Sequence, residues 1–150
     1  MKHIIKFRLL IIGEGKNKYL LEKIIDKNHL NNKIKIINFK TNPFPYIKKS
    51  DVFILSSIFE GLPNVLLEAI SLNKIVISSN CPTGPKEILD NGKGGLLFKM
   101  KNAEDLKKKI LFYFKNRKNC QKKIKHAKKR LKRFDYNENM KKFLNLVNSI

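Results

Sequence analysis

The chain has 150 residues, a length typical of one domain that can bury a hydrophobic core. Its formal net charge is +21, but only four of the 33 basic residues are Arg, and an excess of Lys, Asn and Ile is typical of an AT-rich coding sequence and implies no ligand. No apolar stretch approaches the ~20 residues that cross a bilayer. Cys81 and Cys120 are too few for a disulfide framework or a four-ligand metal site, so we interpret both as reduced thiols.

Short apolar runs alternate with helical patterns through most of the chain. The N-terminal residues 1–13 are too few and too charged for a signal peptide, and they lead directly into the first run. We expect buried strands at residues 8–12, 34–39, 51–56, 75–79 and 95–98, helices at 17–28 and 63–72, and a short turn near Tyr46. This alternation predicts an α/β fold, with a Rossmann-like parallel sheet flanked by helices and a sheet core at about residues 8–98.

The last third of the chain is basic and helical. Residues 99–150 carry 18 Lys and Arg against four acidic residues, which is +14 of the net charge. Apolar residues recur there at helical spacing: Leu106, Ile110, Tyr113 and Phe114, then Cys120, Ile124, Ala127, Leu131 and Phe134, then Met140, Phe143, Leu144 and Val147. We expect C-terminal basic helices at about residues 102–149 that pack on one face of the sheet, because too few heptads are present for a coiled coil. Their lysines could be a solvated surface, could contact an anionic membrane, or could bind nucleic acid, which we do not favour.

The segment from Ser56 to Ala69 carries the most chemical information. An apolar strand is followed by a turn at Gly61, and a helix is expected to start at Pro63, which suits a first helical position. The amides of the first helical turn then remain free to bind a phosphate. The carboxylates of Glu60 and Glu68 flank this helix start and can accept hydrogen bonds from hydroxyls. Phosphate and polyol together suggest a nucleotide sugar.

This segment resembles the E-x7-E signature of retaining GT-B glycosyltransferases, in the family called glycosyl transferases group 1. Seven residues separate Glu60 from Glu68, within Phe-Glu-Gly-Leu-Pro-Asn-Val-Leu-Leu-Glu-Ala. Three further segments resemble the family in the same order: Leu-Ile-Ile-Gly-Glu-Gly at 10–15, Pro-Thr-Gly-Pro-Lys-Glu-Ile-Leu at 82–89, and Asn-Gly-Lys-Gly-Gly-Leu-Leu-Phe at 91–98. The resemblance covers about residues 8–115. It implies the C-terminal, donor-binding half of a GT-B fold.

The resemblance also implies residue roles. Glu60 would be catalytic, through hydrogen bonds to the hydroxyls of the donor sugar, and Glu68 would bind the ribose of the nucleotide. Further donor-binding candidates are Gly61, Leu62, Asn64, Val65, Gly13 and Gly15, and Thr83, Gly84 and Glu87 could lie near donor or acceptor.

Alternatives remain for several of these residues. Glu60 could be a solvated loop carboxylate, Glu68 could form a helix-surface ion pair, and Leu62 could be a packing residue. Residues 13–15 could be a purely structural turn, and Glu87 could be a first-turn residue that interacts with the helix dipole. The three histidines, His3, His29 and His126, have no carboxylate or cysteine at ligand spacing, so we assign them no role.

The chain also departs from the family pattern. The family's donor domain opens with a further strand and helix that carry an Arg and a Lys, and these would precede Lys6. Lys6 and Arg8 lie before or in the wrong strand to replace them. We therefore interpret residues 1–150 as a single, N-terminally truncated donor-binding domain, and we expect the isolated chain to be a poor catalyst or none.

The expected function is transfer of a sugar from a nucleotide sugar, a UDP-hexose or UDP-N-acetylhexosamine, to a glycan or lipid-linked acceptor. The resemblance suggests bacterial surface polysaccharide synthesis, in the cytoplasm or at the inner face of its membrane. The alternative is a non-catalytic or split-enzyme subunit that binds the donor and needs an acceptor-domain chain as partner. We expect no cofactor and no metal, since the chain has no Asp-x-Asp cluster.

Overall fold

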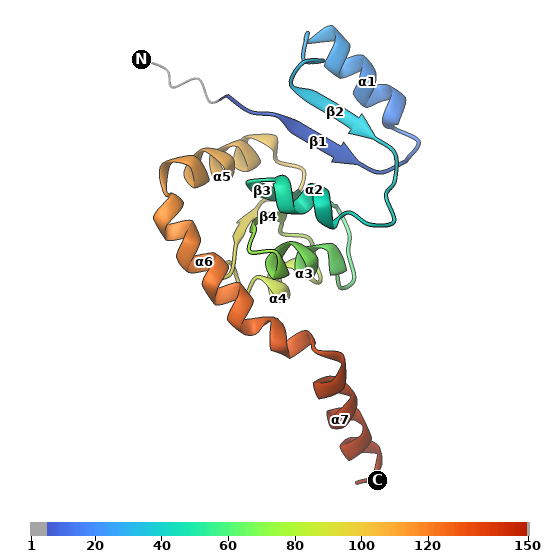
Figure 1. The fold of residues 1–150 in the computed structure, drawn as a ribbon, viewed down its shortest axis with the longest axis vertical. Coiled ribbons are helices and arrows are strands. Elements are labelled where there is room, and N and C mark those ends of the chain that lie inside the picture. The colour runs from blue at the N-terminus through green and yellow to red at the C-terminus, as the bar shows by residue number, and fades with distance from the viewer. Residues whose placement is uncertain (1–5, 150) are drawn as a thin grey trace. The chain divides into compact units, whose positions relative to one another are not determined.

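The computed structural model describes residues 6–149, so residues 1–5, including His3, lie outside it. Strands and helices alternate as far as residue 98 (Figure 1). The strands are β1 (Leu9–Ile12), β2 (Ile34–Ile37), β3 (Val52–Leu55), β4 (Ile75–Ser79) and β5 (Leu96–Phe98). The helices are α1 (Lys18–Lys27), α2 (Phe44–Lys49), α3 (Asn64–Ser71), α4 (Pro85–Ile88), α5 (Ala103–Lys115), α6 (Arg117–Arg130) and α7 (Tyr136–Val147), with the 3-10 helix η1 (Leu131–Phe134). Every expected strand is present, and the turn expected near Tyr46 is the short helix α2.

All strand pairs are parallel, which confirms the predicted Rossmann-like α/β fold class. The described strands form two sheets, however, and not the one sheet that we expected: β1 pairs with β2, and β4 lies between β3 and β5. In the described part of the chain, no backbone hydrogen-bond ladder joins β1 or β2 to β3. Contacts within the chain divide it in the same way, into unit 1 (residues 1–43) and unit 2 (residues 44–150). That residues 1–150 form a single domain stays a prediction.

Unit 1 has little core of its own. In its described residues only Ile25 is buried, on the inner face of α1. Leu20, Leu21 and Ile24 of the same helix remain exposed although they belong to the apolar face that predicted it.

Unit 2 is organised around β4, whose five residues are all buried. Successive side chains of a strand point to opposite faces. On one face, Val76 joins a cluster with residues of α3 and with Ile88 and Leu89, at the end of α4; its members on α3 include Leu66 and Ile70. On the other face lies the second cluster, which consists of Ile75, Ile77, Leu96, Phe98, Tyr113, Cys120 and Ile124. Helices therefore cover both faces of this sheet, with α5 and most of α6 on the second.

The C-terminal helices differ from the expected pattern at one place. The apolar stripe that starts at Cys120 predicts a helix that continues through Leu131 and Phe134. In the structure α6 ends at Arg130, and Leu131–Phe134 form η1. Asp135 then caps α7 by accepting a hydrogen bond from the Glu138 amide at 3.0 Å. Within the described residues, every helix is too short or too polar to span a bilayer.

The two cysteines are free and buried, each about 1% exposed. Cys81 lies in the loop after β4, where its thiol contacts the Thr83 carbonyl oxygen at 3.7 Å. Cys120 belongs to the buried stripe of α6, and burial raises the pKa of its thiol. Both positions fit the interpretation of the two cysteines as unpaired, reduced thiols.

An ion-pair cluster joins the turn after α4 to α6. His126 Nε2 lies 2.7 Å from an Asp90 carboxylate oxygen, and Arg130 Nε lies 3.5 Å from the same oxygen. Asp90, Asn91 and Gly92 follow one another at positive φ (48°, 54° and 89°), a backbone conformation that Asp, Asn and Gly tolerate best. The sequence gives no local signal for this contact, because 36 residues separate the two partners.

Asp90 should make the stability of unit 2 dependent on pH at the acid end. The hydrogen bond from His126, with smaller contributions from Arg130 and Lys93, holds the pKa of Asp90 below its usual value of 3.8, although partial burial opposes this. Stability from a lowered carboxyl pKa is complete above the unfolded pKa and is lost as pH falls through the folded one. We expect Asp90→Asn to destabilise the protein near neutral pH, and the difference from wild type to shrink below about pH 4. Urea titrations across this range measure it; a difference independent of pH would contradict the assignment.

Candidate functional site

The predicted site residues of unit 2 lie on two loops that leave neighbouring parallel strands. The first loop runs from the end of β3 at Leu55 to the start of α3, and it contains Glu60 and Gly61. Helix α3 begins at Asn64, one residue later than expected, because Pro63 is its N-cap, with extended backbone (φ −71°, ψ 96°). Carboxyl ends of parallel strands are where α/β proteins bind ligands, so the loop is where a ligand site is expected.

The N-terminus of α3 offers free amide donors. The Leu66 amide donates back to the Pro63 carbonyl at 2.9 Å, and no side chain caps the helix. The amides of Asn64 and Val65 make no hydrogen bond to any residue that the structure describes. Leu66 is fully buried, whereas Asn64 is exposed, so the helix start is anchored on its inner side and open on the other. The geometry is suited to an anion.

The two glutamates flank this helix start. Glu60 precedes it in the loop, and Glu68 lies on α3, after one turn of helix; both are half-buried. Among the described residues, neither carboxylate is within ion-pair distance of a basic side chain. Glu68 was alternatively expected to form an ion pair on the helix surface, but it has no partner for one in this part of the chain.

The second loop, between β4 and α4, holds the first in place. The Thr83 hydroxyl donates a hydrogen bond to the Glu60 carbonyl oxygen. Gly84 has a φ of +83° and packs so closely on the first loop that a Cβ there would overlap the Gly61 carbonyl and come within 2.5 Å of Pro63 Cδ. The structure thus brings the candidates Thr83 and Gly84 together with Glu60 and Gly61.

Ser79 and Ser57, two serines that sequence reasoning missed, form a further hydrogen bond that holds the first loop. Ser79, the last residue of β4, is fully buried, and its hydroxyl donates to the Ser57 carbonyl oxygen at 2.5 Å. The signal was available, because Ser78 and Ser79 end a strand that is otherwise entirely apolar. A buried hydroxyl needs a partner, and here the partner is the loop of the candidate site.

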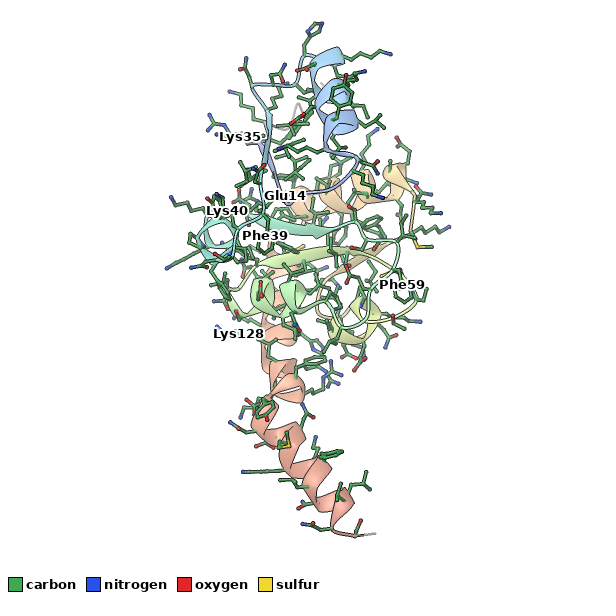
Figure 2. All side chains as sticks on the ribbon, turned by 90° about the vertical axis from the view of Figure 1, so that its right-hand side faces the viewer. Glu14, Lys35, Phe39, Lys40, Phe59 and Lys128 are labelled. Atoms are coloured by element: carbon green, nitrogen blue, oxygen red, sulfur yellow. The ribbon has the colours of Figure 1, made fainter. Side chains whose placement is uncertain are left out.

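The remaining candidates of unit 2 lie at its surface. Leu62 is 47% exposed, which argues against a role in core packing, and its neighbour Phe59 projects from the same loop with 76% exposure (Figure 2). Glu87 lies in the first turn of α4, and its carbonyl accepts a hydrogen bond from Arg133 at 3.1 Å. Both interpretations of the Glu87 carboxylate therefore remain open.

Gly13 and Gly15 belong to unit 1 and are described within it. Gly13 follows β1 at a φ of +145°, and its amide donates to the Ile37 carbonyl at 3.0 Å. The Gly15 carbonyl accepts from the Lys18 amide, the first residue of α1. The predicted arrangement of strand, turn and helix is present, and the role of both glycines toward a donor stays a prediction.

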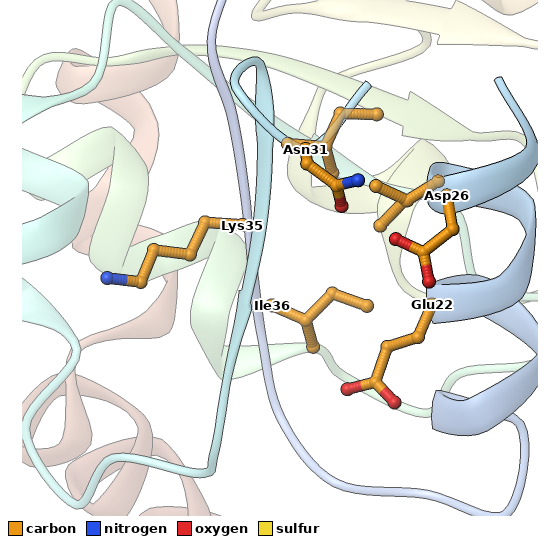
Figure 3. Close-up of a pocket in the computed structure, with 7 residues that line it drawn as sticks. Glu22, Asp26, Asn31, Lys35 and Ile36 are labelled. Atoms are coloured by element: carbon orange, nitrogen blue, oxygen red, sulfur yellow. The ribbon is translucent and has the colours of Figure 1, made fainter. Parts of the chain in front are cut away.

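A shallow pocket of about 330 Å³ also lies in unit 1, between α1 and β2 (Figure 3). Glu22, Asp26, Lys35 and Ile36 are among the residues that line it, and the Lys35 side chain is directed away from Glu22 and Asp26. None of the predicted site residues lines this pocket. Nowhere in the part of the chain that the structure describes do three His, Cys, Asp or Glu side chains gather in a way that could hold a metal ion.

The fold and these loops define a class: an α/β protein whose free helix amides and flanking carboxylates lie at the carboxyl ends of parallel strands. A family model, glycosyl transferases group 1, matches residues 1–130. The chain belongs to this family, and its structural neighbours are GT-B glycosyltransferases.

Two curated relatives and one solved structure illustrate the match. The uncharacterized glycosyltransferase MJ1059 of Methanocaldococcus jannaschii is 46% identical over 55% of this chain and 20% of its own length. The N-acetylgalactosamine-N,N'-diacetylbacillosaminyl-diphospho-undecaprenol 4-alpha-N-acetylgalactosaminyltransferase of Campylobacter jejuni is 30% identical over 85% of this chain and 35% of its own length. HepE of Anabaena, in complex with UDP, superposes with a TM-score of 0.84 at 17% identity, over 96% of this chain and 41% of that one. The chain spans about a fifth to two fifths of the length of these proteins.

Proposed function

We propose that residues 1–150 form the donor-binding part of a retaining glycosyltransferase that uses a UDP-hexose or UDP-N-acetylhexosamine. The acceptor is a glycan or a lipid-linked glycan of bacterial surface polysaccharide synthesis. The observation that carries this proposal is the start of α3, where free amides stand between two half-buried carboxylates without ion-pair partners among the described residues.

Each of these residues would bind a different part of the donor. The amides of Asn64 and Val65 would hold the diphosphate, where the helix dipole favours negative charge as the sugar leaves. Glu68 would accept hydrogen bonds from the ribose hydroxyls, and Glu60 would do so from the sugar hydroxyls and orient the anomeric carbon. Fixed dipoles at a developing charge need no reorganisation during the reaction, which is their catalytic advantage.

Relatives and neighbours support the chemistry by their names. The Campylobacter jejuni relative is an N-acetylgalactosaminyltransferase that acts on an undecaprenol-linked glycan, and HepE was crystallised with UDP. A lipid-linked acceptor would bring the protein to the inner face of the cytoplasmic membrane, where its basic helices would meet anionic lipid.

The length of the relatives bears on catalysis. Because they are more than twice as long as this chain, we propose that residues 1–150 alone bind the donor and transfer sugar weakly or not at all. A second candidate function follows: a donor-binding subunit of a split enzyme, in which a separate chain supplies the acceptor domain. Donor binding requires no cofactor or metal in either case.

Titration calorimetry with UDP and UDP-sugars tests the donor site. We expect Glu60→Gln and Glu68→Gln each to weaken UDP-sugar binding about tenfold or more, because a hydrogen bond to a charged group contributes about 1.5–3 kcal/mol. UDP alone should respond to Glu68→Gln and not to Glu60→Gln, which would contact only the sugar. Glu104→Gln on α5, an exposed glutamate paired with Lys107, is the matched control and should change nothing.

Two outcomes would contradict the proposal. If wild type does not bind UDP at millimolar concentration, the donor site is wrong for this chain. If both variants bind like wild type, the residue roles are wrong. Tight, salt-dependent binding of oligonucleotides in place of UDP would favour a nucleic-acid-binding protein.

A further inference from the structure

The Thr83 hydroxyl connects the two loops of the candidate site at the backbone of Glu60. It donates a hydrogen bond to the Glu60 carbonyl oxygen, and the two residues are 23 apart in the sequence. A hydroxyl has one proton, so Thr83 cannot also donate to a bound ligand while this bond is formed. The contact therefore favours an action of Thr83 through Glu60 over a direct contact with donor or acceptor.

The backbone on the C-terminal side of Glu60 has room to rotate without this bond. The next residue is Gly61, the residue type with the widest choice of backbone conformations, and a Cβ built there would meet no atom within 4 Å. The hydrogen bond from Thr83 fixes the peptide group between Glu60 and Gly61. It thereby fixes the direction in which the Glu60 side chain leaves the backbone.

The bond from Thr83 lies at the surface, unlike the bond from Ser79 to the same loop. Thr83 is exposed, so water competes for both partners and the bond contributes little to the free energy of unfolding. Ser79 is fully buried, and its hydroxyl donates to the Ser57 carbonyl at 2.5 Å. Loss of a buried hydrogen bond costs stability. The Ser79 bond thus contributes mainly stability, and the Thr83 bond mainly position.

We propose that Thr83 is a positioning residue, which holds the Glu60 carboxylate where it meets the hydroxyls of the donor sugar. It thereby raises the affinity for a UDP-sugar relative to that for UDP, the product of the transfer. The groups proposed to bind UDP belong to α3, whose start is anchored by the buried Leu66, so UDP affinity does not depend on Thr83. The inference rests on the proposed function, because Glu60 meets a sugar only if the donor binds at the start of α3.

Titration calorimetry of two Thr83 variants with UDP, UDP-glucose and UDP-N-acetylglucosamine tests the inference. Thr83→Val keeps the branched shape of the side chain and removes the hydroxyl. We expect it to weaken binding of the UDP-sugar that wild type prefers by roughly fivefold or more, and binding of UDP by less than about twofold. Thr83→Ser keeps the hydroxyl and should restore the wild-type ratio of the two affinities.

Ser71→Ala is the matched control, because the Ser71 hydroxyl also donates to a glutamate carbonyl, that of Glu68, at 2.7 Å. The Leu72 amide donates to the same carbonyl at 3.2 Å, so the helix holds this carbonyl without the hydroxyl. Neither affinity should change in this variant. Urea titration should show a larger loss of stability for Ser79→Ala than for Thr83→Val.

The Gly61 amide gives a second readout that needs no ligand. It shares a peptide group with the Glu60 carbonyl, so its nitrogen chemical shift responds to hydrogen bonding at that oxygen. We expect the Gly61 resonance to move in Thr83→Val and to stay close to its wild-type position in Thr83→Ser and Ser71→Ala.

Three outcomes would overturn the positioning role of Thr83. They are equal weakening of UDP and UDP-sugar binding by Thr83→Val, an unchanged affinity for the UDP-sugar, and failure of Thr83→Ser to restore it. If UDP-sugar binding responds to Glu60→Gln and not to Thr83→Val, the donor site stands and only this inference fails. If wild type does not bind UDP at all, the donor site fails and this inference fails with it.

Discussion

Gly84→Ala is expected to destabilise unit 2 by roughly 2–5 kcal/mol, because two costs add. A non-glycine residue at a φ of +83° costs about 1–2 kcal/mol, and an inserted methyl group that forces its surroundings to move costs about 1–3 kcal/mol. The groups that must move are the Gly61 carbonyl and the Pro63 ring, which precede α3 directly. UDP-sugar affinity should therefore fall as well, by about tenfold for a loss of 1.4 kcal/mol.

Two other glycines separate these costs. Gly92 has a similar φ of +89°, but a Cβ there would find its nearest neighbour, Leu97 Cδ1, at 3.9 Å. Gly92→Ala should therefore show the backbone cost alone and leave UDP affinity unchanged. Gly61→Ala meets no atom within 4 Å and should be nearly neutral for stability. Urea unfolding measures the free energy of unfolding of all three variants. Equal losses for Gly84→Ala and Gly92→Ala would show that the two loops can move apart at little cost in free energy.

Leu66→Ala should cost about 2–5 kcal/mol, the range for deletion of a fully buried leucine side chain. Leu66 is 0% exposed in the first turn of α3 and belongs to the cluster that contains Val76 and Leu89. A cavity at this position would weaken the packing that holds the start of α3 against the core.

Leu62→Ala is the matched control on the adjoining loop. Leu62 is 47% exposed, so its truncation should change the free energy of unfolding by less than about 0.5 kcal/mol. Urea titration measures the free energy of unfolding of both variants. A cost for Leu62→Ala comparable with that of Leu66→Ala would return Leu62 to the packing interpretation.

The strands could be predicted because their signal is local. The run Ile75–Ser79 is apolar until its last two residues and bounded by turn residues, and β4 has the predicted bounds. Such a run indicates that a strand is buried, but it does not specify the partner of that strand. The division into two sheets therefore could not be predicted, because pairing depends on contacts between distant parts of the chain.

The end of α6 was missed for a geometric reason. In a 3-10 helix side chains three residues apart share one face, so Leu131 and Phe134 continue the stripe of α6 although the α-helix has ended. No Gly or Pro marks the boundary in the sequence. Apolar spacing alone cannot distinguish the two helix types over a single turn.

The candidate site was predicted where its signal is local, and missed where it is not. The spacing of Glu60 and Glu68 and the glycine and proline between them are visible in one segment. The bond from Thr83 to Glu60 joins residues 23 apart, and the Ser79–Ser57 bond joins residues 22 apart. Sequence patterns carry no information on which backbone carbonyl a distant hydroxyl will meet.

The contacts that residues of the second loop and Ser79 make with the first loop have a consequence for the affinity of a ligand. Thr83, Gly84 and Ser79 fix the backbone of the first loop at three places, by two hydrogen bonds and one close contact. The conformational entropy of that loop is therefore lost when the protein folds, and little remains to be lost when a ligand arrives. A ligand that binds at the start of α3 would therefore meet a loop that is already ordered, and the entropic cost of its binding would be smaller.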